Sequence, residues 1–252
     1  MSVHQFSSLP VYWSDWSTGI LVDRTLYYEY FLLTMITIAF WILAFVVAIT
    51  IHEAAHAFVA DRLGDPTPRL EGRLSLNPIV HYDPIGTTLL FILVLLRALG
   101  FPVIPFGWAK PVRFDPYNLA NPRRDSALIS LAGPSSNLIL AVLISLIFRL
   151  TYSPFSPASF FYGLALPFIV INVALAIFNL IPIHPLDGGK ILVGLLPPKE
   201  ARETDLFLSR YGMIILFFII FPTFGGASLV SIVISPIINF LLNLLTPASS
   251  II

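Results

Sequence analysis

Long apolar runs separated by short polar stretches dominate this sequence. A helix needs about 20 consecutive apolar residues to cross the hydrocarbon core of a bilayer. Runs of about that length lie near residues 31 to 56, 126 to 150, 160 to 182, 206 to 222 and 227 to 245. The pattern predicts an all-α fold, a polytopic membrane helix bundle with about five to six membrane segments.

The first apolar run predicts one long helix, because neither Gly nor Pro occurs from Phe31 to Arg62. Gly64 and Pro66 are expected to end that helix. The polar stretch from Asp65 to Pro84 is rich in Pro, Asn and Gly, which favours a loop or short extended structure.

A further apolar run, from Ile85 to Phe106, makes a poor straight transmembrane helix. It is interrupted by Arg97, Gly100, Pro102 and Pro105. We predict that it enters the membrane and returns as a re-entrant hairpin that turns near Gly100 to Pro105, with its backbone shielded by protein.

The composition agrees with a membrane location. Hydrophobic residues make up 57% of the chain, charged residues 11%, and the mean hydropathy is +0.87, whereas soluble domains contain about 25% charged residues. The formal net charge is zero and no basic block occurs, so the electrostatic signature of a nucleic-acid-binding protein is missing. Because the chain has no cysteine, any metal must be held by His, Asp or Glu.

The N-terminal residues 1 to 28 differ from the rest, being polar and aromatic. Arg24 is their only basic residue, so they lack the basic start of a signal peptide. Interfacial anchoring or packing within a loop would equally explain the aromatic side chains Trp13, Trp16, Tyr27 and Tyr28. We divide the chain into this interfacial segment and a membrane-embedded domain, residues 29 to 252, with a catalytic core at about 31 to 195.

The candidate chemistry begins with His52-Glu53-Ala54-Ala55-His56, an H-E-x-x-H pattern inside the first predicted helix. Two imidazoles four residues apart project from one helix face and can bind one metal ion. Glu53 is placed to take a proton from metal-bound water, whose pKa zinc lowers to about 7. Ionisable side chains within a membrane span are costly and by default indicate function.

Asp187 is the best candidate for a third ligand, which a catalytic zinc site requires. It follows another apolar run, and Gly188 and Gly189 are expected to let the backbone turn so that its carboxylate points inward. The expected cofactor is therefore a single zinc ion.

These residues resemble the site-2 protease family of intramembrane zinc metalloproteases. The resemblance rests on the H-E-x-x-H pattern, on Ala132-Gly133-Pro134, and on the stretch from Asn179 to Gly189, which matches the family's Asn, Pro, Pro and Asp-Gly spacing. It implies that His52, His56 and Asp187 ligate zinc and that Glu53 is the catalytic base.

The resemblance also implies that Asn179 helps to hold the backbone of a substrate, although an Asn that only packs between helices remains an alternative. His184 and Asn137 are expected to lie behind the ligands, with an extra or alternate ligand as a second possibility for His184. His81 is interpreted as structural. The implied partner is a membrane protein or peptide substrate in the bilayer.

Two other functions fit parts of the pattern. A metal or cation transporter could use the same His and Asp residues, and a catalytically inactive scaffold could retain the fold. Glu53 argues against transport, since a transport site does not need a carboxylate in that position. The presence of all four essential residues argues against an inactive scaffold; they are His52, Glu53, His56 and Asp187.

The topology follows from the need for His56 and Asp187 to meet at one depth. Each lies near the C-terminal end of its own run, so the two helices must be parallel, which requires one crossing by residues 126 to 150 and none by the hairpin. The active-site end then carries an excess of basic residues and is predicted to be cytoplasmic in the cell membrane. Residues 206 to 245 are expected either to gate access from the lipid or only to shield the core.

Overall fold

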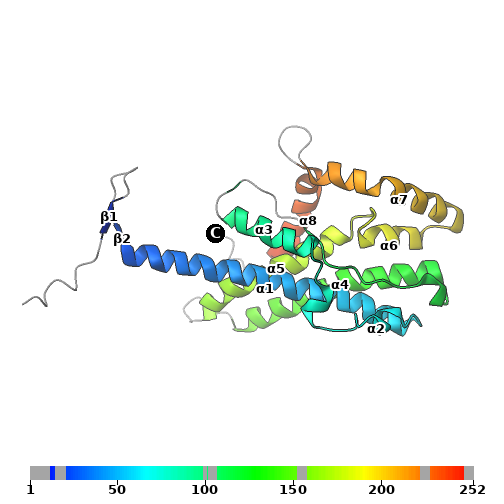
Figure 1. Ribbon diagram of the computed structural model, residues 1–252, viewed down its shortest axis with the longest axis horizontal. Helices are drawn as coiled ribbons and strands as arrows, with labels where there is room; N and C mark the ends of the chain where they lie inside the picture. The colour runs from blue at the N-terminus through cyan, green and yellow to red at the C-terminus, as the bar shows by residue number, and fades with distance from the viewer. Residues whose placement is uncertain are drawn as a thin grey trace, which may run out of the picture.

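The structure of the protein is a computed structural model that describes residues 12–14, 21–98, 101, 107–151, 158–221 and 228–246. After the paired strands β1 (Tyr12–Ser14) and β2 (Leu21–Asp23), this part of the chain is helical. Its elements are α1 (Arg24–Arg62), α2 (Thr67–Leu70), η2 (Pro78–His81), α3 (Gly86–Ala98), η3 (Pro116–Asn118), α4 (Pro122–Thr151), α5 (Ala158–Asn179), α6 (Asp187–Leu195), α7 (Pro198–Ile220) and α8 (Leu229–Leu245). Figure 1 shows them as one elongated helical bundle.

Three of the described helices are long and apolar enough to span a membrane. They are α1 from Phe31 onward, α4 to Leu150, and α5 from Tyr162. Helices α3 and α8 are shorter but apolar. Helix α7 begins at Pro198, eight residues before its predicted apolar run of 206 to 222, and opens with charged residues such as Glu200 and Asp205. The prediction of an all-α membrane bundle is confirmed.

Helices α1 and α4 are antiparallel neighbours. The side chain of Asn137 on α4 donates to the carbonyl of Ala48 on α1. Two turns further along α1, His56 bonds to the carbonyl of Ile129, which lies earlier on α4. The two helices therefore run in opposite directions.

Helix α5 is antiparallel to α4 in turn. Asn137 donates to Asn172 on α5, while Phe148, later on α4, packs edge-on against Tyr162, earlier on α5, with ring centroids 5.4 Å apart. Helices α1 and α5 are consequently parallel, as predicted. Both run from left to right in Figure 1.

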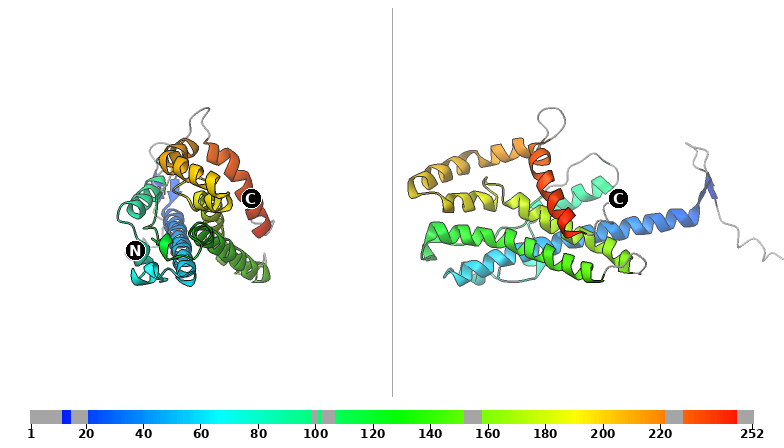
Figure 2. Two further views of the ribbon diagram at one scale, coloured as in Figure 1. Left: turned by 90° about the vertical axis from the view of Figure 1, so that its right-hand side faces the viewer. Right: turned by 180° about the vertical axis from the view of Figure 1, so that it is seen from behind.

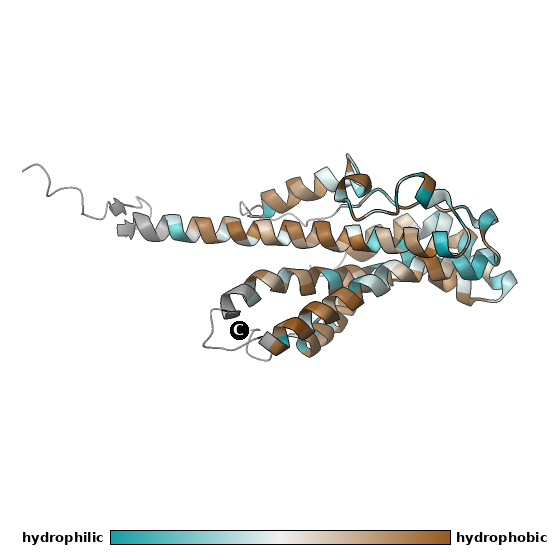
Figure 3. Cartoon of the chain, turned by 90° about the horizontal axis from the view of Figure 1, so that it is seen from below, coloured by the Kyte–Doolittle hydropathy of each residue, from teal (hydrophilic) through white to brown (hydrophobic). Residues whose placement is uncertain are grey.

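Small side chains allow these three helices to approach closely. Ala44 and Ala48 of α1, Ala141 of α4 and Ala176 of α5 are all fully buried. Close approach of this kind replaces hydrophobic driving force in a lipid environment. On the outer faces large apolar side chains remain exposed, and Figure 3 shows that hydrophilic residues gather mainly at the end where α1 finishes.

The end of α1 agrees with the predicted stop signals. Gly64 has φ +108, a left-handed conformation that a residue without a Cβ adopts at low cost. The next residue, Asp65, is fully buried, and its carboxylate accepts hydrogen bonds from Thr67, from the backbone N–H of Asp115 at 2.7 Å and from the Asn118 amide at 2.8 Å. Asp65 therefore ties the loop that precedes α4 to the end of α1.

The segment around α3 leaves and returns at one end, as the hairpin prediction requires. Trp108 lies against Gly86, and the hydroxyl of Thr87 donates to the Trp108 carbonyl at 3.1 Å. Next to this contact, Lys110 N–H donates to the carbonyl of His81 at 2.9 Å. The predicted turn, Gly100 to Pro105, lies largely outside the described residues.

The last helices complete the bundle from two sides, as Figure 2 shows. Leu216 of α7 packs on Ile183 and Leu186, just before α6. Helix α8 packs on the cluster of Ala141, Ile169 and Val173, and its C-terminal carbonyls accept hydrogen bonds from α4. The gating role of residues 206 to 245 stays a prediction.

We expect Asp65→Ala to lower the free energy of unfolding by about 2 to 3 kcal/mol, because several donors lose a charged acceptor in a buried position. Burial raises the pKa of Asp65, but the hydrogen bonds outweigh it and hold that pKa below its ordinary value. The stabilisation is thus present above the unfolded pKa of about 3.9 and disappears as the pH falls through the folded value. Thermal unfolding in detergent at several pH values measures both effects.

Asp115→Ala is the matched control for this prediction. Among the described residues, the Asp115 side chain accepts from the exposed Tyr117 N–H alone, while its own backbone N–H still donates to Asp65. An equal loss of stability in both variants would contradict the role given to Asp65.

Candidate metal centre

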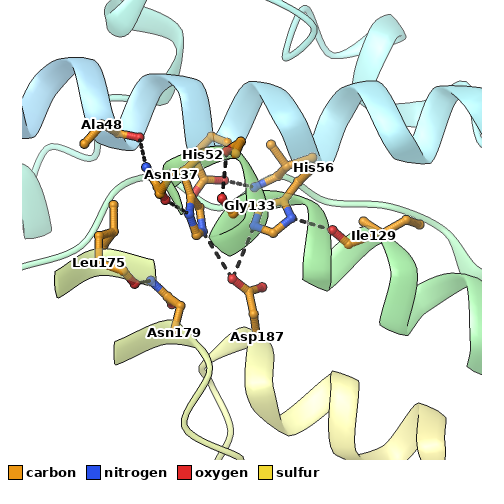
Figure 4. Close-up of polar contacts among 12 residues, drawn as sticks. Ala48, His52, His56, Ile129, Gly133, Asn137, Leu175, Asn179 and Asp187 are labelled. Atoms are coloured by element: carbon orange, nitrogen blue, oxygen red, sulfur yellow. Dashed lines mark hydrogen bonds and ion pairs between the residues drawn. The ribbon is translucent and has the colours of Figure 1, made fainter. Parts of the chain in front are cut away.

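Three side chains, two from α1 and one from α6, converge where α1, α4 and α6 meet (Figure 4). The Nε2 atoms of His52 and His56 lie 3.1 Å and 3.4 Å from the same oxygen, Oδ2, of Asp187. Both imidazoles are buried, and their rings are nearly perpendicular with centroids 4.6 Å apart. We call His52, His56 and Asp187 the metal triad.

The nitrogen on the far side of each imidazole is already engaged. His56 Nδ1 lies 2.7 Å from the carbonyl oxygen of Ile129, and His52 Nδ1 lies 2.6 Å from Oδ1 of Asn137. Both oxygens act as acceptors, so each Nδ1 carries the hydrogen and each Nε2 presents a lone pair. Asn137 therefore lies on the side of His52 that faces away from Asp187.

This arrangement requires a positive charge at the centre of the metal triad. Two lone pairs and a carboxylate oxygen face one another, and in neutral imidazoles no hydrogen lies between them. A second proton on an imidazole or a metal cation can supply the charge. Donors about 2.0 to 2.1 Å from a tetrahedral zinc lie about 3.3 Å from each other, close to the observed 3.1 Å and 3.4 Å. The donor set fits zinc.

Asp187 reaches the centre because it is the first residue of α6. The chain turns through Asn179 to Leu186 before α6 begins, and Gly188 and Gly189 are buried within its first turn. Neither glycine has a positive φ, so the turn before α6 does not depend on a left-handed backbone at these two positions. A Cβ at Gly188 would overlap the carbonyl of Ile181, and one at Gly189 would overlap His184. Close packing therefore explains why both positions are glycine.

Gly133 on α4 is a functional position whose reason the sequence did not reveal. A Cβ built there would lie 2.5 Å from His56 Nε2 and 2.6 Å from His52 Nε2. The missing side chain leaves free the space in front of the two Nε2 atoms. Only the tertiary contact between α1 and α4 makes this visible.

Glu53 lies beside the metal triad and is buried, with 8% of its surface exposed. Its Oε2 accepts a hydrogen bond of 3.0 Å from the backbone N–H of Val112. Val112 belongs to the segment that returns from the hairpin. The hairpin therefore fixes the orientation of this carboxylate, a contact that the sequence pattern did not indicate.

The other predicted residues occupy different positions. The Asn179 amide donates to the Leu175 carbonyl one turn earlier, at 3.0 Å, at the end of α5 near Asp187 (Figure 4). His184 Nε2 lies 3.0 Å from Asp205 of α7 and does not join the metal triad. His81 is buried and bonds to the carbonyl of Ser75, in keeping with its structural interpretation.

Comparison with known proteins agrees with this geometry. The model of peptidase family M50 matches residues 155–221. YwhC of Bacillus subtilis, whose name assigns it to the zinc metalloproteases, is 38% identical over 86% of this chain and 92% of its own. The chain belongs to peptidase family M50, the site-2 protease family. It is a zinc metallopeptidase of the membrane, which decides against the alternative of a cation transporter.

Other relatives support the assignment. The Rip2 protein of Mycobacterium tuberculosis strain H37Rv, also named for a zinc metalloprotease, is 31% identical over 84% of this chain and 75% of its own. Stage IV sporulation protein FB of Bacillus subtilis is 27% identical over 62% of this chain and 52% of its own. No solved structure matches the chain.

We expect Gly133→Ala to weaken zinc binding about tenfold or more, because the added methyl group would displace the His52 and His56 imidazoles. Loss of a hydrogen-bond partner behind a metal ligand already weakens metal binding by about tenfold or more, and displacement of the imidazoles themselves should have at least that effect. Competition with a chromogenic chelator on detergent-purified protein measures the affinity. Gly163→Ala is the matched control, since a Cβ there meets nothing within 4 Å. Wild-type affinity in Gly133→Ala would contradict the steric argument.

Proposed function

We propose that this protein is an intramembrane zinc endopeptidase that hydrolyses peptide bonds in membrane-spanning or membrane-adjacent substrates. His52, His56 and Asp187 hold the metal, and Glu53 is the general base. The observation that carries the proposal is the convergence of two imidazole lone pairs and a carboxylate next to a buried glutamate.

The roles of the protein groups follow from their contacts. The metal, when bound, supplies Lewis acidity that activates water and polarises the scissile carbonyl. Glu53 holds one carboxylate oxygen against Val112 N–H, which leaves the other oxygen to accept a proton from the attacking water. The same carboxylate then delivers the proton to the leaving amine.

The substrate must present an unwound peptide bond to this site. In a helix the backbone hydrogen bonds occupy the carbonyl that is to be attacked. Asn179 lies at the end of α5, where the helix gives way to the turn before Asp187. We propose that its side chain pairs with the extended backbone of the substrate once its bond to Leu175 is exchanged.

The central experiment for this proposal separates metal binding from chemistry. His52→Ala, His56→Ala and Asp187→Ala should lose zinc, because each removes one of three ligands. Glu53→Gln should retain about one zinc per chain and lose cleavage by a factor of at least about 100. Metal analysis and cleavage of a panel of single-span substrates measure both quantities.

His184→Ala is the control, since its imidazole faces Asp205. It should keep its zinc. Full activity in Glu53→Gln would exclude the proposed mechanism, and stoichiometric zinc loss in His184→Ala would make that residue a ligand.

We further propose that the active-site end faces the cytoplasm and that the protein resides in the cell membrane. With the hairpin returning to its own side, one end of the bundle carries most of the basic residues. They are Arg62, Arg69, Arg73, Lys110, Arg113, Arg123, Arg124, Lys190, Lys199, Arg202 and Arg210, against Arg24 and Arg149 at the other end.

Single-cysteine labelling tests this topology in a chain that has no cysteine of its own. Cysteines at the exposed positions Arg69, Tyr117 and Lys199 should react only from the cytoplasmic face. A cysteine at Leu150, which is 87% exposed at the far end of α4, should react only from outside. Labelling of the Tyr117 site from outside would exclude the hairpin topology.

A further inference from the structure

A fully buried asparagine in the middle of α5 has no direct contact with the metal triad, yet it is connected to it. Asn172 and Asn137 both have 0% of their surface exposed. The Asn137 amide donates to Oδ1 of Asn172 at 2.7 Å, and Oδ1 of Asn137 faces His52 Nδ1 at 2.6 Å. A polar chain thus runs from α5 through α4 to a ligand on α1.

Backbone carbonyls, which can only accept hydrogen bonds, set the donor-to-acceptor direction of the hydrogen bonds that link Asn172, Asn137 and His52. The Asn172 amide donates to the carbonyl of Phe168 at 2.7 Å, so its oxygen must face Asn137. The two hydrogens of the Asn137 amide are then taken by Asn172 and by the carbonyl of Ala48 at 3.0 Å. The oxygen of Asn137 is left to face His52.

Removal of the acceptor on Asn172 would weaken this orientation. One hydrogen of the Asn137 amide would lie unpaired in an apolar bundle, where no water replaces the partner. Of the two bonds that the Asn137 amide nitrogen donates, only the one to Ala48 would remain. If it turned its nitrogen toward His52, Nδ1 would have to accept, and the imidazole hydrogen would move to Nε2, where it blocks a metal ion.

We propose that Asn172 is a positioning residue of the metal centre, which acts through Asn137 to keep the lone pair of His52 Nε2 directed at the metal. The proposal rests on the metal site proposed above and adds to it a residue from α5. Helix α5 also leads directly into the turn that carries Asp187. Asn172 therefore links the helix before one ligand to the orientation of another.

A purely structural role, in which Asn172 only joins α4 to α5, makes a different prediction. It would affect stability without changing the metal centre. Three variants separate the two roles: Asn172→Leu removes the acceptor at similar volume, Asn172→Asp keeps an acceptor oxygen toward Asn137, and Ser145→Ala removes another buried side-chain hydrogen bond from α4, to the carbonyl of Leu245.

The experiment measures zinc affinity by chelator competition, and the visible absorption of the cobalt-substituted protein, in detergent. Asn172→Leu should bind zinc about tenfold more weakly and alter the cobalt spectrum, as loss of an oriented group behind a ligand does. Asn172→Asp should restore both to near wild type. Ser145→Ala should leave both unchanged.

A double-mutant cycle tests whether the effect passes through Asn137. In the Asn137→Leu background, Asn172→Leu should cause no further loss of zinc affinity. An equal additional loss there, or wild-type affinity and cobalt spectrum in the single variant, would overturn the proposal. If His52→Ala retained zinc, the proposed metal site itself would be wrong. If His52→Ala lost zinc as expected but Asn172→Leu kept wild-type zinc affinity and cobalt spectrum, only the role of Asn172 would be refuted.

Discussion

The structure depends on the satisfaction of polar groups inside an apolar bundle. A polar atom that faces lipid or packed side chains has no water to bond to, so it needs a protein partner. Here the buried amides of Asn137 and Asn172 and the outer nitrogens of both histidines are paired with one another or with backbone carbonyls. These pairings leave two imidazole lone pairs directed at Asp187, and that polarity makes the site suitable for a cation.

The same constraint explains the packing around the site. Side-chain hydrogen bonds between α1, α4 and α5 require the helices to approach closely, and fully buried alanines permit it. Gly133 is the extreme case, because any side chain there would enter the space of the ligand atoms. The close approach of the helices and the positions of the His52 and His56 nitrogen atoms therefore both follow from the pairing of buried polar groups.

The polar end of the bundle is organised by a second set of buried contacts. Asp65 accepts bonds from the loop before α4, and Arg73 donates to the carbonyls of Val80 and Lys110. These bonds hold the segment that returns from α3 across the end of α1. Val112, in that segment, donates to Glu53, so the returning segment is a direct neighbour of the glutamate beside the metal triad.

The sequence by itself determined the helical membrane class, the end of α1 at Gly64, the parallel course of α1 and α5, and the residues of the metal triad. The helical class and the end of α1 depend on local composition and on short spacings. Asp187 and the parallel course followed from the chemical requirement for a third zinc ligand at the depth of His52 and His56. Tertiary structure alone decided the roles of Gly133, Val112 and Asn172, and it showed that Gly188 and Gly189 pack against Ile181 and His184. These roles arise between residues far apart in sequence, because close approach and hydrogen-bond direction exist only once helices pack.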